Sequence, residues 1–497
     1  MKIKVTHTFK SFPSTIIIPI RSGKGINKSF NLLTELFGVH KSYLKHNFKA
    51  LFGQSLSFSF SKKTSVILLG LGNDLSYNNV RRAFRLLSHN QKNILSADIA
   101  IDQLTGNLPL GSSSQANIAE ASVAGLRLGV YSIGHYKTGK TQRHPLSSEK
   151  AQIQIITAQS AAKLCREAAI KGSHYGGAMP GIYQLVNGPG NKSTPAALAE
   201  HARASGKKHG FSVKVFDKAK IEKEELGALI AVNKGSELPP VFIIMEYKPQ
   251  NVGGNDLKTV GLVGKGVTFD TGGLSIKGSN NMHYMKSDMG GAAAVLGAME
   301  MTARLQLPVH LIGIIPATDN CVDAKSVRPG DVINSYSGKT IEIIDTDAEG
   351  RLILADGLAY MIKNYNPEII IDLATLTGSC VQTLGYEMGG LFTNNQKLAN
   401  RLKTAGEKVG EQVWQLPLSD SFANDIVSDV ADVKNFSGRP IGGAIVAAKF
   451  LEFFTENHKA WAHLDIAGVA FGDNPFSKYK SATGYGVNLI VEFLRKC

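Results

Sequence analysis

Acidic side chains that could bind metal ions lie in three short, glycine-rich stretches of the chain. The stretches are residues 263–273, 285–291 and 345–352, and their acids are Asp270, Asp288, Asp347 and Glu349. Four carboxylates within a few ångströms of one another would take up protons unless cations neutralised them. Two divalent metal ions would do so, and a bridged pair of such ions is known in several hydrolytic enzymes. The spacing Asp347-x-Glu349 lets two carboxylates of one turn reach neighbouring ions.

Three cationic side chains in or next to the same stretches add to this cluster: Lys265, Lys277 and Arg351. The four carboxylates balance two dications, so a cationic Lys277 and Arg351 leave room for a hydroxide and one further anion. Such a site is suited to polarising a carbonyl group and to stabilising a tetrahedral oxyanion. The cluster therefore predicts metal-assisted chemistry at a carbonyl carbon.

The elements that must position these groups are expected from apolar, β-branched runs in the second part of the chain. Strands are expected at residues 212–216, 241–247, 259–263, 309–315, 340–344 and 369–373. Helical segments lie between several of them, which is typical of buried parallel strands joined by crossover helices. Sites in such sheets form beyond the carboxyl ends of strands. Val263 and Ile344 each end an expected strand, so the stretches 263–273 and 345–352 are expected at that edge.

The length of 497 residues, with 43% hydrophobic residues, predicts a globular protein of two domains. In the first part, strands are expected at 14–19, 56–60, 64–69, 127–133 and 151–157, and helices at 80–89, 114–123 and 158–171. We predict an N-terminal α/β domain over 1–174 that ends in a linker helix. A larger catalytic α/β domain with a mixed, mainly parallel sheet is predicted over 175–497.

The cysteine content and the hydropathy of the chain indicate in which cellular compartment the protein is expected. The four cysteines are scattered without C-x-x-C spacing, which favours a reducing compartment and predicts a cytoplasmic protein. No run of about 18 apolar residues occurs, so no membrane span is expected.

Positive charge is concentrated at the N-terminus. The formal net charge is +15, and residues 1–63 contain eleven Lys or Arg and one acid, Glu35. A basic face can attract nucleic acid, but a solvated lysine-rich surface is the commoner cause. A transit peptide is a third interpretation, although Thr15 to Ile20 is typical of a first core strand.

The motifs resemble those of the leucyl aminopeptidase family, which are cytosolic, two-metal, homohexameric peptidases. Asp345-Thr-Asp-Ala-Glu-Gly-Arg-Leu352 differs by one residue from the family's Asn-Thr-Asp-Ala-Glu-Gly-Arg-Leu motif. Residues 263–270, 275–277, 285–292 and 463–468 are similar to its other motifs, in the same order. The resemblance extends from about residue 175 to the end, and more loosely into the first part.

The resemblance implies a role for each charged residue. A tight metal site would comprise Lys265, Asp270, Asp288 and Glu349, and a more exchangeable site would comprise Asp270, Asp347 and Glu349. Lys265 would bind as a neutral amine, because an adjacent dication depresses its pKa. Lys277 would bind the substrate carbonyl and its oxyanion. Arg351 would hold a bicarbonate as general base, and the two ions would be zinc or manganese.

The resemblance also implies the substrates and the assembly. The side-chain pocket would comprise Met285, Thr375, Leu376, Gly378, Ala467 and Ala470. This apolar lining suits N-terminal leucine or methionine of a peptide, whose free amino group would sit on a metal. Ala470 is smaller than the Met of some relatives and predicts a roomier pocket. A homohexamer is expected by resemblance alone.

Two alternatives stay open, and one of them arises because the chain departs from the family pattern. Asp345 replaces an Asn, Asp319 replaces a Glu, and Gly190 replaces a Pro. None removes a proposed ligand, but Asp345 adds negative charge beside the metals. A catalytically silent relative is therefore one alternative, and a nucleic-acid-binding role of the basic N-terminal domain is the other. Taken singly, Asp347 is also a candidate cap for the helix expected after Ala348.

Overall fold

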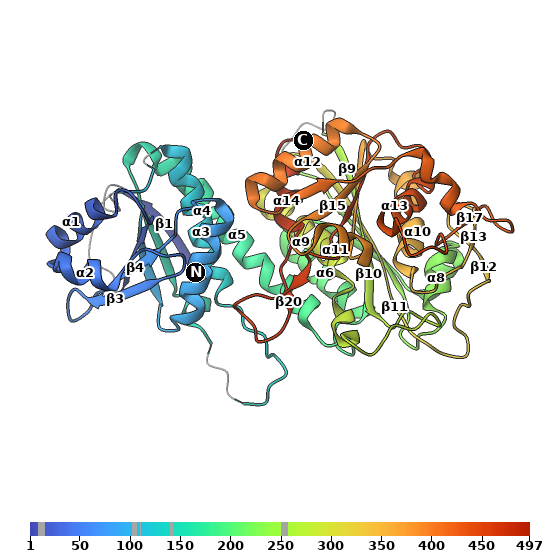
Figure 1. The fold of residues 1–497 in the computed structure, drawn as a ribbon, viewed down its shortest axis with the longest axis horizontal. Coiled ribbons are helices and arrows are strands. Elements are labelled where there is room, and N and C mark those ends of the chain that lie inside the picture. Colours follow the sequence, from blue (N-terminus) through green and yellow to red (C-terminus); the bar gives the residue numbers. More distant parts are fainter. Residues whose placement is uncertain (8–14, 102–106, 110, 140–142, 250–256) are drawn as a thin grey trace. The chain divides into compact units, whose positions relative to one another are not determined.

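The chain forms two compact units in the computed structural model (Figure 1), which describes residues 1–7, 15–101, 107–109, 111–139, 143–249 and 257–497. One unit comprises Met1–Pro180 with Pro475–Lys478, and the other comprises Gly181–Asn474 with Tyr479–Cys497. The predicted boundary after residue 174 falls within helix α5 (Ala162–Asn187). In the part of the chain that is described, no helix is long and apolar enough to cross a membrane.

The first unit is built on a six-stranded sheet with the order β1-β6-β5-β2-β4-β3. Its strands are β1 (Lys2–Thr6), β2 (Thr15–Ile20), β3 (Ser55–Ser59), β4 (Ser65–Gly70), β5 (Ser96–Ala100) and β6 (Gln152–Ile156). All neighbouring strands run parallel except β3, which is antiparallel to β4. Residue 14, the first of an expected strand, lies outside the described residues.

Both faces of this sheet are covered by helices. These are α1 (Ile26–Phe37), α2 (Lys41–Asn47), α3 (Tyr77–Asn90) and α4 (Ser112–Leu128). Every residue of β2 is buried, because its side chains alternate between two hydrophobic clusters. Ile17 packs in the cluster that contains Phe84 of α3, and Ile16 packs in the cluster that contains Phe30 of α1.

One expected strand of the first unit is wrong. Residues 127–133 form the end of α4 and a following turn. Nearly every residue of α4 from Ile118 to Leu128 is buried, so its apolar end is explained by a helix enclosed on several sides.

The second unit contains a nine-stranded sheet. The order is β16-β15-β18-β14-β9-β11-β8-β7, and β10 pairs with β11. The strands are β7 (Ser212–Phe216), β8 (Val241–Tyr247), β9 (Thr259–Gly264), β10 (Gly266–Asp270), β11 (His310–Asn320), β14 (Ile369–Ala374), β15 (Gly389–Thr393), β16 (Val413–Gln415) and β18 (Trp461–Asp465). The central strands β18, β14, β9 and β11 are parallel, whereas β7, β8 and β15 add antiparallel pairs. The predicted α/β class with a mixed, mainly parallel sheet is confirmed.

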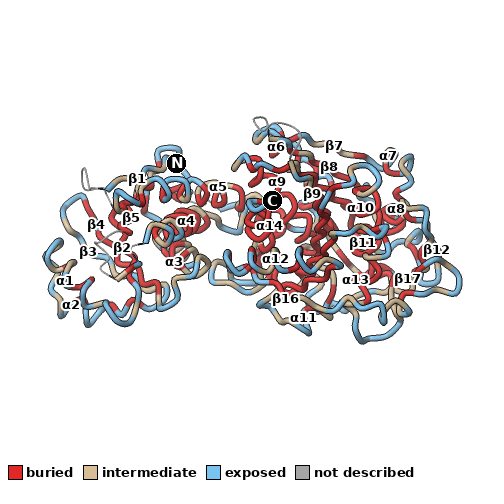
Figure 2. The backbone as a smooth tube through the Cα atoms, turned by 90° about the horizontal axis from the view of Figure 1, so that it is seen from above, coloured by how far each residue is buried: buried red, intermediate tan, exposed pale blue. Residues whose placement is uncertain are grey.

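Helices cover both faces of the large sheet, and its strands form the buried centre (Figure 2). On one face lie α6 (Pro195–His209), α9 (Gly290–Leu305), α12 (Gln396–Val409) and α14 (Val487–Leu494). On the other lie α8 (Gly227–Asn233), α10 (Glu349–Tyr365) and α13 (Gly443–Phe453). Helix α10 packs Leu354 and Leu358 into a cluster that also contains Val263 of β9 and Ile370 of β14. This packing fixes the helix whose first residue is Glu349.

The chain segment that precedes α10 comes from a separate three-stranded sheet. It comprises β12 (Val332–Asn334), β13 (Thr340–Glu342) and β17 (Val433–Lys434). The expectation that residues 340–344 belong to the large parallel sheet is therefore wrong. The stretch that begins at Asp345 is nevertheless brought to the large sheet, because α10 packs on it.

Candidate metal centre and active site

The strands β9 and β10 deliver the first two charged groups of the cluster. Lys265 lies between them, and its backbone is fixed by N–H donation to the Leu373 carbonyl of β14 at 3.0 Å. Asp270 ends β10 next to Asn320 of β11. The Asn320 amide donates to Oδ1 of Asp270 at 2.9 Å and so orients this carboxylate. These side chains lie at the carboxyl end of parallel strands, as expected for this class of sheet.

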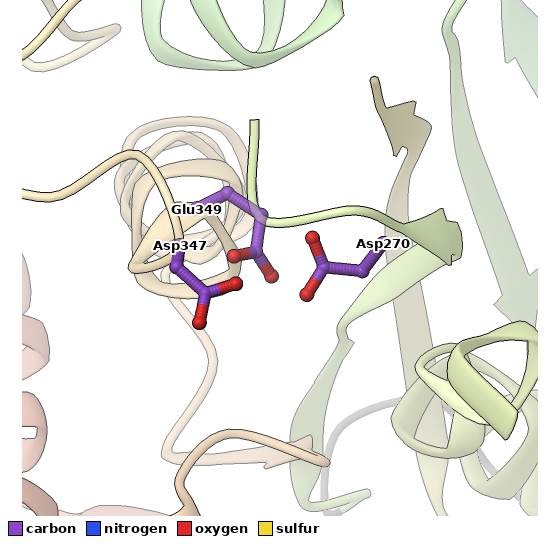
Figure 3. Close-up of side chains that lie close together, drawn as sticks. All are labelled: Asp270, Asp347 and Glu349. Carbon is purple, nitrogen blue, oxygen red and sulfur yellow. The ribbon is translucent and has the colours of Figure 1, made fainter. Parts of the chain in front are cut away.

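Three carboxylates converge on one point (Figure 3). Asp270, Asp347 and Glu349 each offer an oxygen, and these oxygens all lie within 4.8 Å of one another. Glu349 is the first residue of α10, and Ala348 occupies the cap position without a capping side chain. The side chain of Asp347 therefore points to the cluster instead of capping the helix.

Two lysines occupy the same cluster. The Lys265 Nζ lies 2.8 Å from Oδ2 of Asp288 and 2.8 Å from Oε1 of Glu349. The Lys277 Nζ lies 2.8 Å from Oδ2 of Asp270 and also contacts Asp347. Each amine thus bridges two acids, which lowers the repulsion that four adjacent carboxylates would otherwise exert.

Burial and neighbouring charge shift the pKa values of these groups. Burial raises the pKa of Glu349, and Asp270 raises it further. Burial likewise raises the pKa of Asp347 to about 7. Burial alone would lower the pKa of Lys265, but Asp288 and Glu349 outweigh it, so the pKa of this amine is raised. Lys265 therefore keeps its proton until another cation replaces its charge.

The donor set fits divalent metal ions. Oε2 of Glu349 is buried and has no hydrogen-bond partner within the described residues, although a buried carboxylate normally has one. It belongs to the group of three carboxylates that approach within ligand distance. Oxygen donors of this kind suit hard or borderline cations such as manganese and zinc. The residues therefore fit a metal centre with an amine, Lys265, beside it.

A reciprocal clamp holds the loop that carries Lys277. The Ser275 N–H donates to Oγ1 of Thr346 at 2.8 Å, and the Thr346 N–H donates to Oγ of Ser275 at 3.2 Å. Gly272 in this loop has φ of +87°, and a Cβ there would lie 2.5 Å from the Ser275 carbonyl oxygen. Only glycine allows this close turn, which explains the Thr-Gly-Gly sequence before Lys277.

Asp345 shapes the acidic turn. Its Oδ1 accepts the Asp347 N–H at 2.8 Å, the hydrogen bond of an Asx turn. An asparagine would accept the same bond, so the departure from the family motif keeps the turn and adds a charge. Asp319 is buried, whereas Gly190 lies against the ring of Phe269.

A cavity of about 610 Å³ opens over the cluster. The predicted residues that line it are Lys265, Asp270, Lys277, Met285, Asp288, Asp347, Glu349, Arg351, Thr375, Leu376, Gly378 and Ala467. Ala470 is buried and does not line the cavity; its Cβ lies against Gly290. The structure thus brings together every predicted metal-binding and catalytic residue and all but one of the predicted pocket residues.

Several residues around the cavity were not predicted. Phe436, Val381 and Phe471 add to its apolar wall. Asp465 accepts the Leu376 and Ala467 N–H groups at 3.2 and 3.1 Å, and so joins two sides of this wall. Asp465 lies within the stretch 463–468, which was the only sequence signal for it.

Comparison with known proteins agrees with this geometry. Residues 182–491 match the model of the cytosol aminopeptidase family, catalytic domain. The chain belongs to the cytosol aminopeptidase family. A probable cytosol aminopeptidase of Chloroherpeton thalassium is 46% identical over 443 residues, 86% of each chain. One from Chlorobium limicola is 41% identical over 509 residues and covers 100% of both chains.

Two solved structures are similar to nearly the whole chain. A tomato leucine aminopeptidase variant has a TM-score of 0.85 at 31% identity, covering 100% of this chain and 97% of that one. The bottromycin maturation enzyme BotP in complex with Mn has a TM-score of 0.82 at 32% identity, with 97% and 99% coverage. The predicted family is confirmed, and the chain is a metal-dependent aminopeptidase. The nucleic-acid-binding and catalytically silent alternatives are not favoured.

Gly350 gives a first test of the cluster in this cytosol aminopeptidase. A Cβ at Gly350 would lie 2.6 Å from Cε of Lys265, an amine that Asp288 and Glu349 already fix. Gly350→Ala should therefore displace the amine and lower kcat/KM by about 10–100-fold, as loss of a partner of a metal ligand does. The displaced amine is buried between two acids, so the melting temperature should also fall.

Gly139→Ala is the control for this variant, because nothing lies within 4 Å of a Cβ at Gly139 and this residue does not line the cavity. Equal kcat/KM values for the two variants would contradict the proposed sensitivity of Lys265.

Proposed function

We propose that this chain is a two-metal aminopeptidase that releases N-terminal leucine, methionine and other mainly apolar residues from peptides. The observation that carries the proposal is the convergence of Asp270, Asp347 and Glu349 within 4.8 Å below an apolar-walled cavity. In this proposal, Lys265, Asp270, Asp288 and Glu349 hold one ion. Asp270, Asp347 and Glu349 hold the other.

In the proposed reaction, the metal ions and the protein side chains have different roles. Bound there, two divalent ions, zinc or manganese, supply Lewis acids for a carbonyl oxygen and lower the pKa of a water molecule. Lys277 lines the same cavity, and its amine would donate to the substrate carbonyl and to the oxyanion that develops there. Its loop is fixed by the clamp between Ser275 and Thr346, so the donor is held in place before substrate arrives.

Arg351 is the candidate holder of the general base. Burial lowers the pKa of Arg351 to about 10, and the side chain remains a cation at neutral pH. Its Nε is buried without a hydrogen-bond partner within the described residues, and the side chain lines the cavity. An anion that presents two oxygens side by side, such as bicarbonate, matches a guanidinium of this kind. Arg351 would hold this anion, which would supply a general base.

Substrate selection is assigned to the apolar wall. Met285, Leu376 and Ala467 line the cavity, and Asp465 holds the backbone of Leu376 and Ala467. A leucine or methionine side chain would bury apolar surface there, at about 25 cal/mol per Å². Ala470 lies behind this wall, against Gly290, and would limit its depth.

Cleavage of leucine p-nitroanilide by protein loaded with Mn²⁺ or Zn²⁺ tests this function. We expect nitroaniline release from the free amine and none from N-acetyl-leucine p-nitroanilide, because the free amino group is required. Lysine and glutamate p-nitroanilides should have lower kcat/KM values. Equal cleavage of the acetylated substrate would contradict an aminopeptidase. About one metal equivalent or less per active chain, instead of two, would contradict the two-metal site.

Metal binding should also stabilise the protein. At a free Mn²⁺ concentration of about 100 times Kd, binding at one site adds about 2.7 kcal/mol to the free energy of unfolding. This gain should raise the melting temperature of EDTA-treated protein by about 2–4 °C, measured by scanning calorimetry. The surface variant Asp429→Asn should show the same rise. An unchanged melting temperature in the wild type would argue against a metal centre.

The oligomeric state of the protein and its cellular location are proposed from its family. We infer a homohexamer in the cytoplasm that acts on peptide substrates. Sedimentation of the purified chain tests the hexamer. Binding of nucleic acid by the basic N-terminal segment stays a prediction, which a salt-dependent shift of duplex DNA would support.

A further inference from the structure

We propose that Asn435 is a positioning residue for this site. Its side-chain amide holds the turn that carries Asp347 and Glu349, and its backbone carbonyl holds Arg351. The catalytic part of this inference rests on the function proposed above. The contacts that carry it lie within the second unit, in the small sheet and the turn that follows it.

The small sheet delivers Asn435 to the turn. Strands β13 and β17 are parallel, with Glu342 paired to Lys434. The pairing continues one step further, because the Asn435 N–H donates to the Glu342 carbonyl at 3.0 Å. Asn435 is fully buried there, beside the chain that leaves β13 toward α10.

The side-chain amide of Asn435 joins the two ends of the turn. Its Oδ1 accepts the Ile344 N–H at 2.8 Å and the Asp345 N–H at 3.3 Å. Its Nδ2 donates to the Asp345 carbonyl at 2.6 Å and, more weakly, to the Ala348 carbonyl at 3.4 Å. Asn435 thus satisfies backbone groups immediately before Asp347 and Glu349. Both carboxylates depend on this turn for their direction.

The same residue also fixes the guanidinium. Nη1 of Arg351 donates to the Asn435 carbonyl at 2.8 Å. Within the described residues, the side chain of Arg351 makes this hydrogen bond, and its Nε has no hydrogen-bond partner. One buried residue therefore sets the distance between the acidic turn and Arg351. Phe436, the next residue, lines the cavity.

Asn435 acts through its neighbours. It does not line the cavity, so it has no direct contact with a substrate there. A side chain that only stabilised the fold would change the melting temperature and leave the properties of the folded site intact. A positioning residue changes metal affinity and kcat in protein that is folded. These two readouts separate the roles.

Two variants test the proposal. Asn435→Asp keeps the acceptor for Ile344 but loses the amide donors, whereas Asn435→Ala removes the side-chain bonds without adding charge. We expect either variant to weaken Mn²⁺ binding by about tenfold or more and to lower kcat by about 10–100-fold. KM for leucine p-nitroanilide should stay within about threefold, because the apolar wall is untouched. Equilibrium dialysis with Mn²⁺ alone measures the affinity.

Asn395→Asp is the matched control. Asn395 also accepts a backbone N–H, from Leu398 at 3.0 Å, and donates to a carbonyl, of Lys459 at 3.0 Å, but it does not line the cavity. This variant should keep wild-type Mn²⁺ affinity and kcat. Gel filtration and circular dichroism measure the folded fraction of each variant.

The outcomes are distinct. Folded Asn435→Ala protein with Mn²⁺ affinity and kcat within about twofold of the wild type would overturn the proposal. So would a fall in melting temperature alone. A wild type that binds Mn²⁺ but cleaves no anilide would instead refute the proposed function, while the comparison of Mn²⁺ affinities would still decide the role of Asn435.

Discussion

Glu349→Ala should reduce the release of nitroaniline from leucine p-nitroanilide by more than about 100-fold, because even a partner of a metal ligand costs about 10–100-fold when removed. Glu349 is 1% exposed, and in the proposed centre it serves both metal ions. Its loss would also remove one of the two ion pairs of Lys265 among the described residues and leave the one with Asp288. Initial rates at saturating Mn²⁺ give the effect, and equilibrium dialysis should show weakened binding.

A second substitution separates charge from packing. Glu349→Gln keeps the volume of the side chain and removes its negative charge, so the variant should fold and still lose most activity. Glu407→Ala, at an exposed position of helix α12, should leave the rate unchanged. If Glu349→Gln retained wild-type activity, the assignment of this carboxylate to the metals would fail.

The chemistry of the site was predictable because its groups lie in a few continuous motifs. Asp347, Glu349 and Arg351 are placed by the first turn of one helix and by the residues just before it, so their proximity follows from local geometry. Lys265 directly precedes strand β10, and Asp270 is its last residue. The expected end of β9 near Val263 was correct to one residue, since a buried β-branched run specifies a strand well.

The support of the acidic turn was not predictable in the same way. Strands β13 and β17 contain three and two residues, too few for a period-two pattern to emerge. Their pairing joins Ile341 to Val433, and no local signal specifies a contact over that separation. Asn435 was missed for the same reason. Asparagine is a common residue type, and the role proposed for Asn435 depends on the backbone groups to which it is hydrogen-bonded.

The incorrect prediction of a strand at 127–133 has a different cause. Apolar residues there satisfy a strand pattern, yet Leu126 and Leu128 complete the buried helix α4. Tertiary burial on several faces of a helix removes the polar positions that would otherwise mark its period. Short apolar runs are ambiguous between strand and helix for this reason.

Lys277→Met should separate catalysis from metal binding in this protein. Lys277 Nζ lies 2.8 Å from Oδ2 of Asp270 and contacts Asp347, so in the metal-free protein it competes with a cation for the same oxygens. Methionine keeps most of the length of the side chain and removes the charge. Mn²⁺ affinity should therefore be retained or increased.

The rate of the same Lys277→Met variant should change in the opposite direction. An oxyanion donor typically contributes about 10²–10³-fold to kcat, so the variant should lose activity by that factor. Lys286→Met, which removes a lysine whose Nζ donates to the Asn187 carbonyl at 3.0 Å, is the matched control and should lose much less. Because Lys277 is the amine assigned to the oxyanion, a kcat within about threefold of the wild type would remove that assignment. Weaker Mn²⁺ binding would instead mean that Lys277 supports the metal centre.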